Sequence, residues 1–397
     1  MTSLIDTQDE SLRRRSRWHR VWTLPLLVLA LVVLAAVGIT ALLPSRLVAT
    51  KVQDDEATAA PYAITPRTAT PVDDHVSFGA LAGVAEVDPD RKGDIYFVTV
   101  SEPSQSVLGW WAAGGESCNR NLPPDVSRCS ALPQIDLLTT RDKYGTRTPT
   151  ETRRISLQMM RTASQVAQYV ALKKLGYDDA TIDPGAVVVA DLVAGAPAAS
   201  VLEIGDTITA VAGTPTPDVD DLVTALAGKH PGDVVEVAID RPGTGATTVS
   251  VELMASPDDA SRTIVGIVPF DTASVHLPFE VKIDTGQIGG PSAGLAFTLT
   301  LIDELSPGDL TGGANVAVTG EIALDGSVGA IGGLAQKVSA VRQAGVRHFL
   351  VPTAQGPDQI ARAREIGDDD VEIIPVATLD EALAALAGLG GDPLPSR

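Results

Sequence analysis

The feature that most constrains this chain is an uncharged apolar run near its N-terminus. Residues 24–43 contain no charged side chain, and the basic segment from Arg13 to Arg20 precedes them. A helix of this length spans about 30 Å, the thickness of the hydrocarbon core of a bilayer. Because basic flanks stay in the cytoplasm, we expect residues 1–20 to be a cytoplasmic tail, residues 21–44 a single transmembrane helix, and the remainder to be extracytoplasmic. A cleaved signal peptide is the alternative, and it places the bulk of the chain in the same compartment.

The composition of the chain limits its partners. Its 397 residues leave room for two or three domains, and the hydrophobic share of 44% favours folded cores over disorder. The formal net charge of -20 would repel a phosphate backbone, so we expect no nucleic-acid partner. The histidines show no spacing typical of a zinc site, and we expect neither a metal nor a cofactor.

The only cysteines, Cys118 and Cys129, lie in a polar loop that follows the strand predicted below. Outside the cytoplasm this pair would meet oxidising conditions, and a bridge closing so short a loop adds about 3 kcal/mol. We therefore expect a disulfide, with two unpaired thiols as the alternative.

Mixed strand and helix signals after residue 44 predict an α+β fold. Residues 45–72 include Pro61, Pro66 and Pro71 without a sustained period, so we interpret them as a stalk. In the following extracytoplasmic region, residues 73–182, the aromatic and β-branched residues of 93–100 predict a strand. Apolar residues at every third or fourth position predict a helix from Ser156 to Gly176.

Residues 186–254 form a compact pattern of strands, glycine turns and one short helix at 219–227. The order of a strand, the GAPAAS turn, LEIGDTITAVAGTP, the helix and PGDVVEVAIDR resembles a bacterial PDZ domain, which we place at residues 183–256. PDZ domains bind an extended peptide as an added strand. The resemblance implies that the peptide terminus meets exposed N–H groups near Gly185, Ala186 and Val187; an ordinary turn glycine at 185 is the alternative.

A glycine turn further along the chain offers a candidate nucleophile. In GGPSAG, residues 289–294, Gly290 and Pro291 suit the start of a helix and place Ser292 in its first turn. The unpaired N–H groups there, from Gly290, Ser292 and Ala293, would face an oxyanion formed beside the serine hydroxyl. Taken alone, this motif is also typical of a helix-opening turn.

A serine hydroxyl needs a base, and the sequence around it supplies no histidine motif. Residues 315–352 predict a strand, a hairpin at Asp325–Gly326, and a helix after Gly332–Gly333 that carries Lys337. A lysine acts as a base only when neutral, so its pKa of about 10.4 must fall by roughly 3 units, on the order of 4 kcal/mol of desolvation. A solvated helix lysine is the alternative.

Three segments in register closely resemble the proteolytic domain of Lon-type Ser-Lys proteases: GGPSAG at 289–294, TGEIALDGSVGAIGGLAQK at 319–337 and AGVRHFLVP at 344–352. The resemblance covers about residues 277–386. It implies Ser292 as nucleophile, Lys337 as general base, and Thr319 as the threonine that supports the lysine. Gly289 departs from the pattern, because many Lon domains carry an acidic residue there.

The resemblance also reaches back before the PDZ-like module. The strand at 93–100 and the helix segment 160–170 look like early elements of a Lon domain. The PDZ domain would then be inserted into, or precede, a Lon-type domain whose main part is residues 257–397. Membrane-anchored bacterial proteins with both domains form a family that this chain resembles.

The expected function follows from that resemblance. It implies an ATP-independent, membrane-anchored serine endopeptidase whose PDZ domain selects unfolded or tail-exposing extracytoplasmic proteins. The sequence contains no GxxxxGK[ST] phosphate loop. The competing hypothesis is a catalytically inactive PDZ peptide-binding scaffold of the cell envelope, and a third is an enzyme that cuts its own stalk. Lon domains commonly assemble into rings, so the resemblance also implies a homo-oligomer.

Overall fold

The computed structural model describes residues 27–45, 47, 61–79, 92–112 and 135–395. The chain divides into two compact units. The smaller comprises residues 1–63, 103–131 and 136–139, and the larger comprises residues 64–102, 132–135 and 140–397. The predicted cytoplasmic tail and the pair Cys118 and Cys129 lie outside the described residues, so the disulfide stays a prediction.

The smaller unit contains a helix over residues 27–42, whose side chains are mostly exposed. Its chain continues to Pro44, which forms a bridge with Ser106, and the N–H of Val107 donates to the carbonyl of Leu43 at 2.8 Å. Within the part of the chain that the structure describes, no helix combines the length and the apolarity needed to cross a membrane. The first residues of the predicted transmembrane helix, 21–26, lie outside that part.

The described helices and strands have the following bounds. The strands are β1 (Tyr62–Pro71), β2 (Val76–Phe78), β3 (Ile95–Ser101), β4 (Asp136–Leu138), β5 (Thr181–Leu192), β6 (Thr207–Val211), β7 (Thr214–Pro215), β8 (Val234–Arg241), β9 (Gly245–Glu252), β10 (Met254–Ala255), β11 (Thr263–Ile264), β12 (Ile267–His276), β13 (Val281–Ile283), β14 (Val316–Val318), β15 (Glu321–Ile322), β16 (Val328–Gly329), β17 (His348–Pro352) and β18 (Glu372–Val376). The α-helices are α3 (Val107–Ala112), α4 (Thr140–Tyr144), α5 (Pro149–Lys174), α6 (Val219–Ala225), α7 (Gly294–Leu305), α8 (Leu334–Ala344), α9 (Pro357–Gly367) and α10 (Leu379–Gly388).

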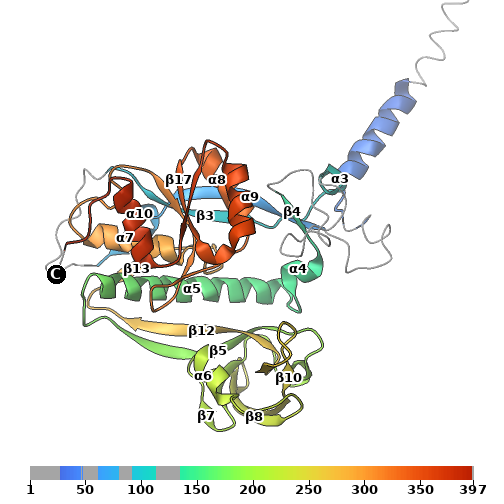
Figure 1. Ribbon diagram of the computed structural model, residues 1–397. Helices are drawn as coiled ribbons and strands as arrows, with labels where there is room; N and C mark the ends of the chain where they lie inside the picture. The colour runs from blue at the N-terminus through green and yellow to red at the C-terminus, as the bar shows by residue number, and fades with distance from the viewer. Residues whose placement is uncertain (1–26, 46, 48–60, 80–91, 113–134, 396–397) are drawn as a thin grey trace, which may run out of the picture. The chain divides into compact units, whose positions relative to one another are not determined.

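One sheet of the larger unit runs in the order β18-β17-β14-β3-β1, with helices on both faces (Figure 1). Its strands β3, β14, β17 and β18 are parallel, and β1 is antiparallel to β3. Successive side chains of a strand point to opposite faces. Accordingly Val316 and Val318 pack with α5, α7 and α10, whereas Ala317 packs with α8 and α9. A sheet covered on both faces explains why these strands are apolar along their whole length.

The early part of the chain contributes two strands to this sheet. The predicted strand at 93–100 is β3, which lies between β1 and β14. Strand β1 corrects the predicted stalk: residues 62–71 form a strand, and its Thr65 pairs with Ser101 and its Pro71 with Tyr96 of β3. The prolines of this segment do not prevent pairing, because β1 tolerates them through a register shift between Pro66 and Ala69.

The second sheet, in the order β12-β5-β6-β8-β9, forms the PDZ-like module together with α6. Its buried core includes Val187, Ile208, Leu222, Val237 and Val251. The boundary predicted at residue 256 lies between β10 (Met254–Ala255) and β11 (Thr263–Ile264). Strand β12, which belongs to the stretch predicted as protease, pairs with β5 from Ile267 to His276, so this sheet includes a strand from beyond the predicted boundary.

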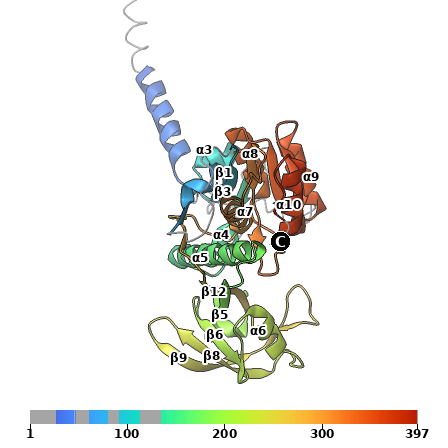
Figure 2. The same cartoon turned by 90° about the vertical axis from the view of Figure 1, so that its left-hand side faces the viewer.

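Helix α5 lies between the two sheets. It contacts α7 on one side and β12 on the other (Figure 2). Thr148 caps it in a capping box with Glu151, and Pro149 occupies its first turn, so the helix begins before the predicted Ser156. Ala167 and Val170 enter the core with α7, while Ile155 is buried against the PDZ strand β5. One helix therefore packs into the protease core and into a separate small cluster with β5.

Candidate active site

Ser292 lies in the turn that leads into α7. The N–H of Gly294 donates to the carbonyl of Pro291 at 3.1 Å, and Ala293 is the N-cap of the helix. The helix thus begins two residues after the serine, whereas the sequence predicted Ser292 within the first turn. Gly290 has a φ of +89°, and its N–H already donates to the carbonyl of Ser156 at 2.8 Å. This sharp entry delays the helix and leaves the serine side chain at the edge of the cleft.

Lys337 comes from the first turn of α8 and is 2% exposed. Its Nζ lies 2.7 Å from the Oγ of Ser292 and 2.8 Å from the Oγ1 of Thr319. The glycine before the helix, Gly333, adopts a left-handed conformation with a φ of +70° and accepts from the N–H of Lys337. The structure therefore brings together the three side chains that the resemblance selected from two distant segments.

Thr319 has a second contact that orients the group. Its Oγ1 donates to the carbonyl oxygen of Ser292 at 3.1 Å, and the N–H of Gly320 donates to the same oxygen at 3.0 Å. Because the threonine hydroxyl hydrogen is used in this way, its oxygen accepts an N–H of Lys337. A neutral lysine then has its lone pair free to accept the proton of the serine hydroxyl.

Burial controls the charge of this lysine. Desolvation lowers the pKa of Lys337 to about 7, while the nearby carboxylate of Glu321 acts in the opposite direction. Burial also raises the pKa of the Glu321 carboxyl, and the lysine opposes that effect. Desolvation therefore makes the uncharged form of Lys337, the form able to act as a base, accessible near neutral pH.

The predicted oxyanion donors are placed unequally. The N–H of Gly290 is occupied by the carbonyl of Ser156, which corrects its predicted role as a donor. Among the described residues, no hydrogen bond engages the N–H groups of Ser292 and Ala293. These two amides, at the start of α7, remain as the candidates.

The departure at Gly289 has a steric cause. A Cβ added at this position would lie 2.8 Å from the Cβ of Ser156 and 3.1 Å from its carbonyl carbon. Helix α5 therefore excludes the acidic side chain that many Lon domains carry there. An acidic side chain elsewhere in the motif, Glu321, lines the same cleft and acts electrostatically on Lys337.

The dyad opens into a cleft of about 580 Å³. Its apolar wall comes from Phe97 of β3, Leu157 and Met160 of α5, and Ile288 and Ile331. Its charged side chains other than the dyad and Glu321 are Arg67, Glu102, Lys143 and Arg153. Within the described ranges, no cluster of histidine, cysteine and acidic side chains could hold a metal ion.

One charged pair in this cleft was missed by the sequence analysis. The Nζ of Lys143 donates to the carbonyl of Glu102 and lies 4.0 Å from its carboxylate. Burial raises the pKa of the Glu102 carboxyl and lowers the pKa of the Lys143 amine. Neither residue lies in a recognisable motif, so no signal in the sequence could have identified them.

The residues predicted to receive a peptide terminus lie within β5. Val187 pairs with Asp271 of β12 on one side and with Ile208 of β6 on the other. The N–H of Ala186 donates to the Oγ1 of Thr272 at 3.0 Å, and Gly185 lies against the same threonine. The structure thus corrects the expectation of exposed N–H groups at this point, because β5 is an inner strand. Among the described strands of this sheet, β12 lies at an edge.

Comparison with known proteins finds a family match for each of two regions. Residues 262–388 match the Lon protease (S16) C-terminal proteolytic domain, and residues 155–253 match the PDZ domain. The PDZ match begins inside α5, which also packs on α7. The Lon match begins before β12, which pairs with the PDZ strand β5.

Individual relatives are similar to parts of this chain. A Lon protease of Roseiflexus castenholzii is 32% identical over 166 residues, covering 38% of this chain and 20% of that protein. A Lon protease of Xanthomonas oryzae pv. oryzae is 40% identical over 94 residues, covering 24% of this chain and 11% of that protein. The matches thus span a fifth or less of these relatives' length. The crystal structure of the PDZ domain of an SdrC-like protein from Listeria monocytogenes is 24% identical, with a TM-score of 0.20, and covers 22% of this chain and 88% of that one.

Proposed function

We propose, from the premise that this chain contains a Lon-type proteolytic domain and a PDZ domain, that it is a serine endopeptidase with a Ser292–Lys337 dyad. One observation carries the proposal: the amine of a lysine that is 2% exposed lies 2.7 Å from the serine hydroxyl. Burial favours the neutral form of an amine when no carboxylate forms a hydrogen bond with it. The neutral form is the one that a general base needs.

The proposed reaction is a two-step acyl transfer. The Oγ of Ser292 attacks a peptide carbonyl as Lys337 takes its proton, and the resulting tetrahedral oxyanion is stabilised by the amides of Ser292 and Ala293. The C–N bond then breaks and the protonated lysine gives its proton to the leaving amine. Water hydrolyses the acyl-enzyme by the same route, with Lys337 accepting the water proton and returning it to Ser292.

The reaction in this geometry needs no nucleotide, and we propose that cleavage is ATP-independent. Substrates must then already present an accessible segment, as unfolded proteins and exposed tails do. The sequence supports this proposal through the lack of a GxxxxGK[ST] motif.

The PDZ domain is the proposed selector of those substrates. An extended segment can pair with an edge strand, where main-chain hydrogen bonds supply affinity. Strand β12 is such an edge, and the start of α6 lies beside it, where the N–H of Val219 donates to the carboxylate of Asp271 at 2.8 Å. Peptide pairing along β12 replaces the predicted site at Gly185, Ala186 and Val187.

Attachment to the cell membrane by residues 21–44, with the catalytic domain outside the cytoplasm, remains part of the proposal. The exposed apolar side chains of the helix over residues 27–42 support it, including Leu34 at 67% and Leu42 at 76% exposure. Membrane fractionation of the full chain and of a variant without residues 1–44 tests it, since only the full chain should resist alkaline carbonate extraction. A homo-oligomer is proposed from the resemblance alone, and sedimentation of the detergent-solubilised chain tests it.

Labelling of the serine tests the enzymatic function. A peptidyl phosphonate should modify Ser292 in the wild-type chain, and Ser292→Ala should lose both this label and the cleavage of unfolded extracytoplasmic proteins. An unmodified serine together with undiminished peptide binding would overturn the protease and support the PDZ scaffold. Mass analysis of the mature chain tests self-processing. A chain that is shortened at its N-terminal region in wild type but not in Ser292→Ala would identify it.

A further inference from the structure

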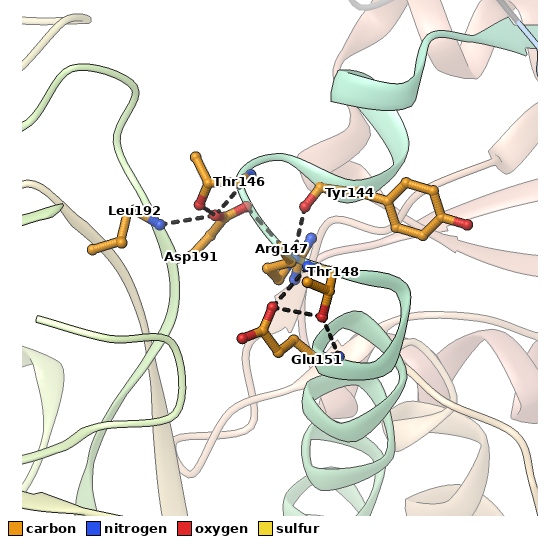
Figure 3. Close-up of polar contacts among 7 residues, drawn as sticks. All are labelled: Tyr144, Thr146, Arg147, Thr148, Glu151, Asp191 and Leu192. Atoms are coloured by element: carbon orange, nitrogen blue, oxygen red, sulfur yellow. Dashed lines mark hydrogen bonds and ion pairs between the residues drawn. The ribbon is translucent and has the colours of Figure 1, made fainter.

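The PDZ strand β5 and the segment before α5 meet in a polar contact around Asp191 (Figure 3). The Oδ1 of Asp191 accepts from the N–H and the hydroxyl of Thr146 and, at 2.8 Å, from the N–H of Leu192. Its Oδ2 lies 3.5 Å from the Nε of Arg147. The Asp191 side chain is only 13% exposed, whereas Thr146, its partner, is exposed.

The fit between these two segments is close. Gly145 has a φ of +60°, and a Cβ added to it would lie 1.9 Å from the Oδ2 of Asp191. Any side chain at 145 would therefore displace the carboxylate. Arg147 is fixed a second time, because its Nε also donates to the carbonyl of Tyr144 at 3.2 Å.

The clamped segment leads directly into α5. The next residue, Thr148, caps the helix in a reciprocal pair with Glu151, as Figure 3 shows. The PDZ module holds the following turn as well: Ile155 is buried against Val188 and Ala190 of β5, and the Nη2 of Arg154 donates to the carbonyl of Ile204 at 3.1 Å.

The same turns of α5 form one wall of the catalytic cleft. Pro149, Thr152 and Arg153 line it, and the carbonyl of Ser156 accepts the N–H of Gly290 at 2.8 Å. That hydrogen bond fixes the glycine turn two residues before Ser292. A physical connection thus runs from Asp191 through residues 146–156 to the loop of the nucleophile.

We propose that Asp191 is a positioning residue for the Ser292–Lys337 reaction, acting through the start of α5. This inference deepens the proposed function and rests on it. Its consequence is that the PDZ module is a structural part of the catalytic cleft. Reaction rates at Ser292 then depend on a PDZ residue even for substrates too short to reach β12.

The experiment compares full-length wild type, Asp191→Ala and Asp191→Asn in the acylation of Ser292 by a dipeptidyl phosphonate and in the cleavage of a short fluorogenic peptide. A displacement near 1 Å at a reacting group can cost up to about a hundredfold in rate, so we expect Asp191→Ala to lower kcat and the acylation rate roughly tenfold or more, with KM little changed. Asp191→Asn should lose less, because its amide oxygen can still accept from Thr146 while the charge facing Arg147 is gone.

Two controls separate positioning from folding. Asp233→Ala removes an aspartate contact of the same module, the bond from the N–H of His230 at 2.8 Å, without touching α5, and should leave kcat unchanged. Titration with the phosphonate to completion counts folded sites, so a positioning defect slows labelling but leaves its final extent intact. If Asp191→Ala does not fold, Asp191→Asn, Arg147→Gln and their double variant carry the test. The double variant should lose no more kcat than the slower of the two single variants.

The outcomes distinguish the two proposals. Wild type that is never labelled at Ser292 overturns the proposed protease and this inference with it. If wild type is labelled and both Asp191→Ala and Asp191→Asn react at the wild-type rate, only the positioning role is overturned. A loss confined to KM, or an equal loss in Asp233→Ala, overturns it as well.

Discussion

Two cations, Lys337 in the protease region and Arg241 in the PDZ module, differ in burial and in partners. In the protease region Lys337 is 2% exposed and contacts two hydroxyls, and desolvation lowers its pKa to about 7. In the PDZ module the side chain of Arg241 is 19% exposed and contacts the buried carboxylate of Asp206 at 2.7 Å, and this hydrogen bond raises its pKa. Hydroxyl partners leave the buried lysine a reactive amine, whereas the guanidinium, which is always charged, compensates a buried carboxylate and so stabilises the fold.

Lys337→Met should produce the largest effect, because it removes the base and keeps an apolar chain of similar length. We expect turnover of an unfolded protein substrate to fall by at least about 10⁴-fold, while the fold is retained because no buried charge is left unpaired. Steady-state cleavage and thermal unfolding measure the two effects. Lys143→Met, in the same cleft, is the matched control and should keep most of the activity; turnover of Lys337→Met within tenfold of wild type would contradict the account.

Arg241→Met tests the other side of the comparison. It leaves the carboxylate of Asp206, 0% exposed, without its cation, so we expect the free energy of unfolding to fall by about 3–5 kcal/mol. Urea denaturation of the full chain measures this loss. Adding Asp206→Leu should restore much of it, because the pair is then replaced by apolar groups. An unchanged midpoint in Arg241→Met would show that the pair is not a structural element.

Thr319→Val sharpens the role of the hydroxyl partners. The valine keeps the shape of threonine but removes the acceptor for Lys337 and one donor to the carbonyl of Ser292. We expect kcat to fall roughly thirtyfold, about 2 kcal/mol. Thr319→Ser retains the hydroxyl and should recover most of the rate. Equal activities of the valine and serine variants would remove the hydroxyl from the mechanism.

Glu321→Gln should produce the smallest effect, a shift in pH dependence. The neutral amine is the active form, so the wild-type rate should rise through about pH 7 and level off above it, with the rate lost on the acid side. Glu321 favours the protonated lysine, so its removal should move the midpoint to lower pH. Glu365→Gln on the exposed face of α9 is the control and should not move it. A midpoint shifted upward in Glu321→Gln would contradict the assigned direction.

The reacting residues were selected by the resemblance to Lon-type domains, because the glycine turn at Ser292 and the helix of Lys337 each allowed another interpretation when taken alone. The glycines beside Ser292 and Lys337 set sharp entries into α7 and α8, and such entries are readable from local sequence. The start of α5 was also readable from the sequence. Thr148 and Glu151 have the spacing of a capping box, and Pro149 between them suits the first turn of a helix. The prediction missed it by relying on apolar periodicity, which begins later.

Other features depend on contacts between distant segments. The carbonyl of Ser156 occupies the N–H of Gly290, and nothing near residue 290 indicates this. Strand β12 contains Pro269 and polar residues, so its pairing with β5 became visible only in the fold. The placement of Gly185, Ala186 and Val187 on an inner strand follows from that same pairing.

The most direct test of the account is the rate of phosphonate labelling at Ser292, followed by mass spectrometry across pH 5–9 in wild type and Lys337→Met. The account predicts a wild-type rate that rises with a midpoint near pH 7 and a variant that remains unlabelled throughout this range. Equal labelling of the two proteins, or a wild-type rate that does not change between pH 5 and 9, would contradict the claim that an uncharged Lys337 activates Ser292.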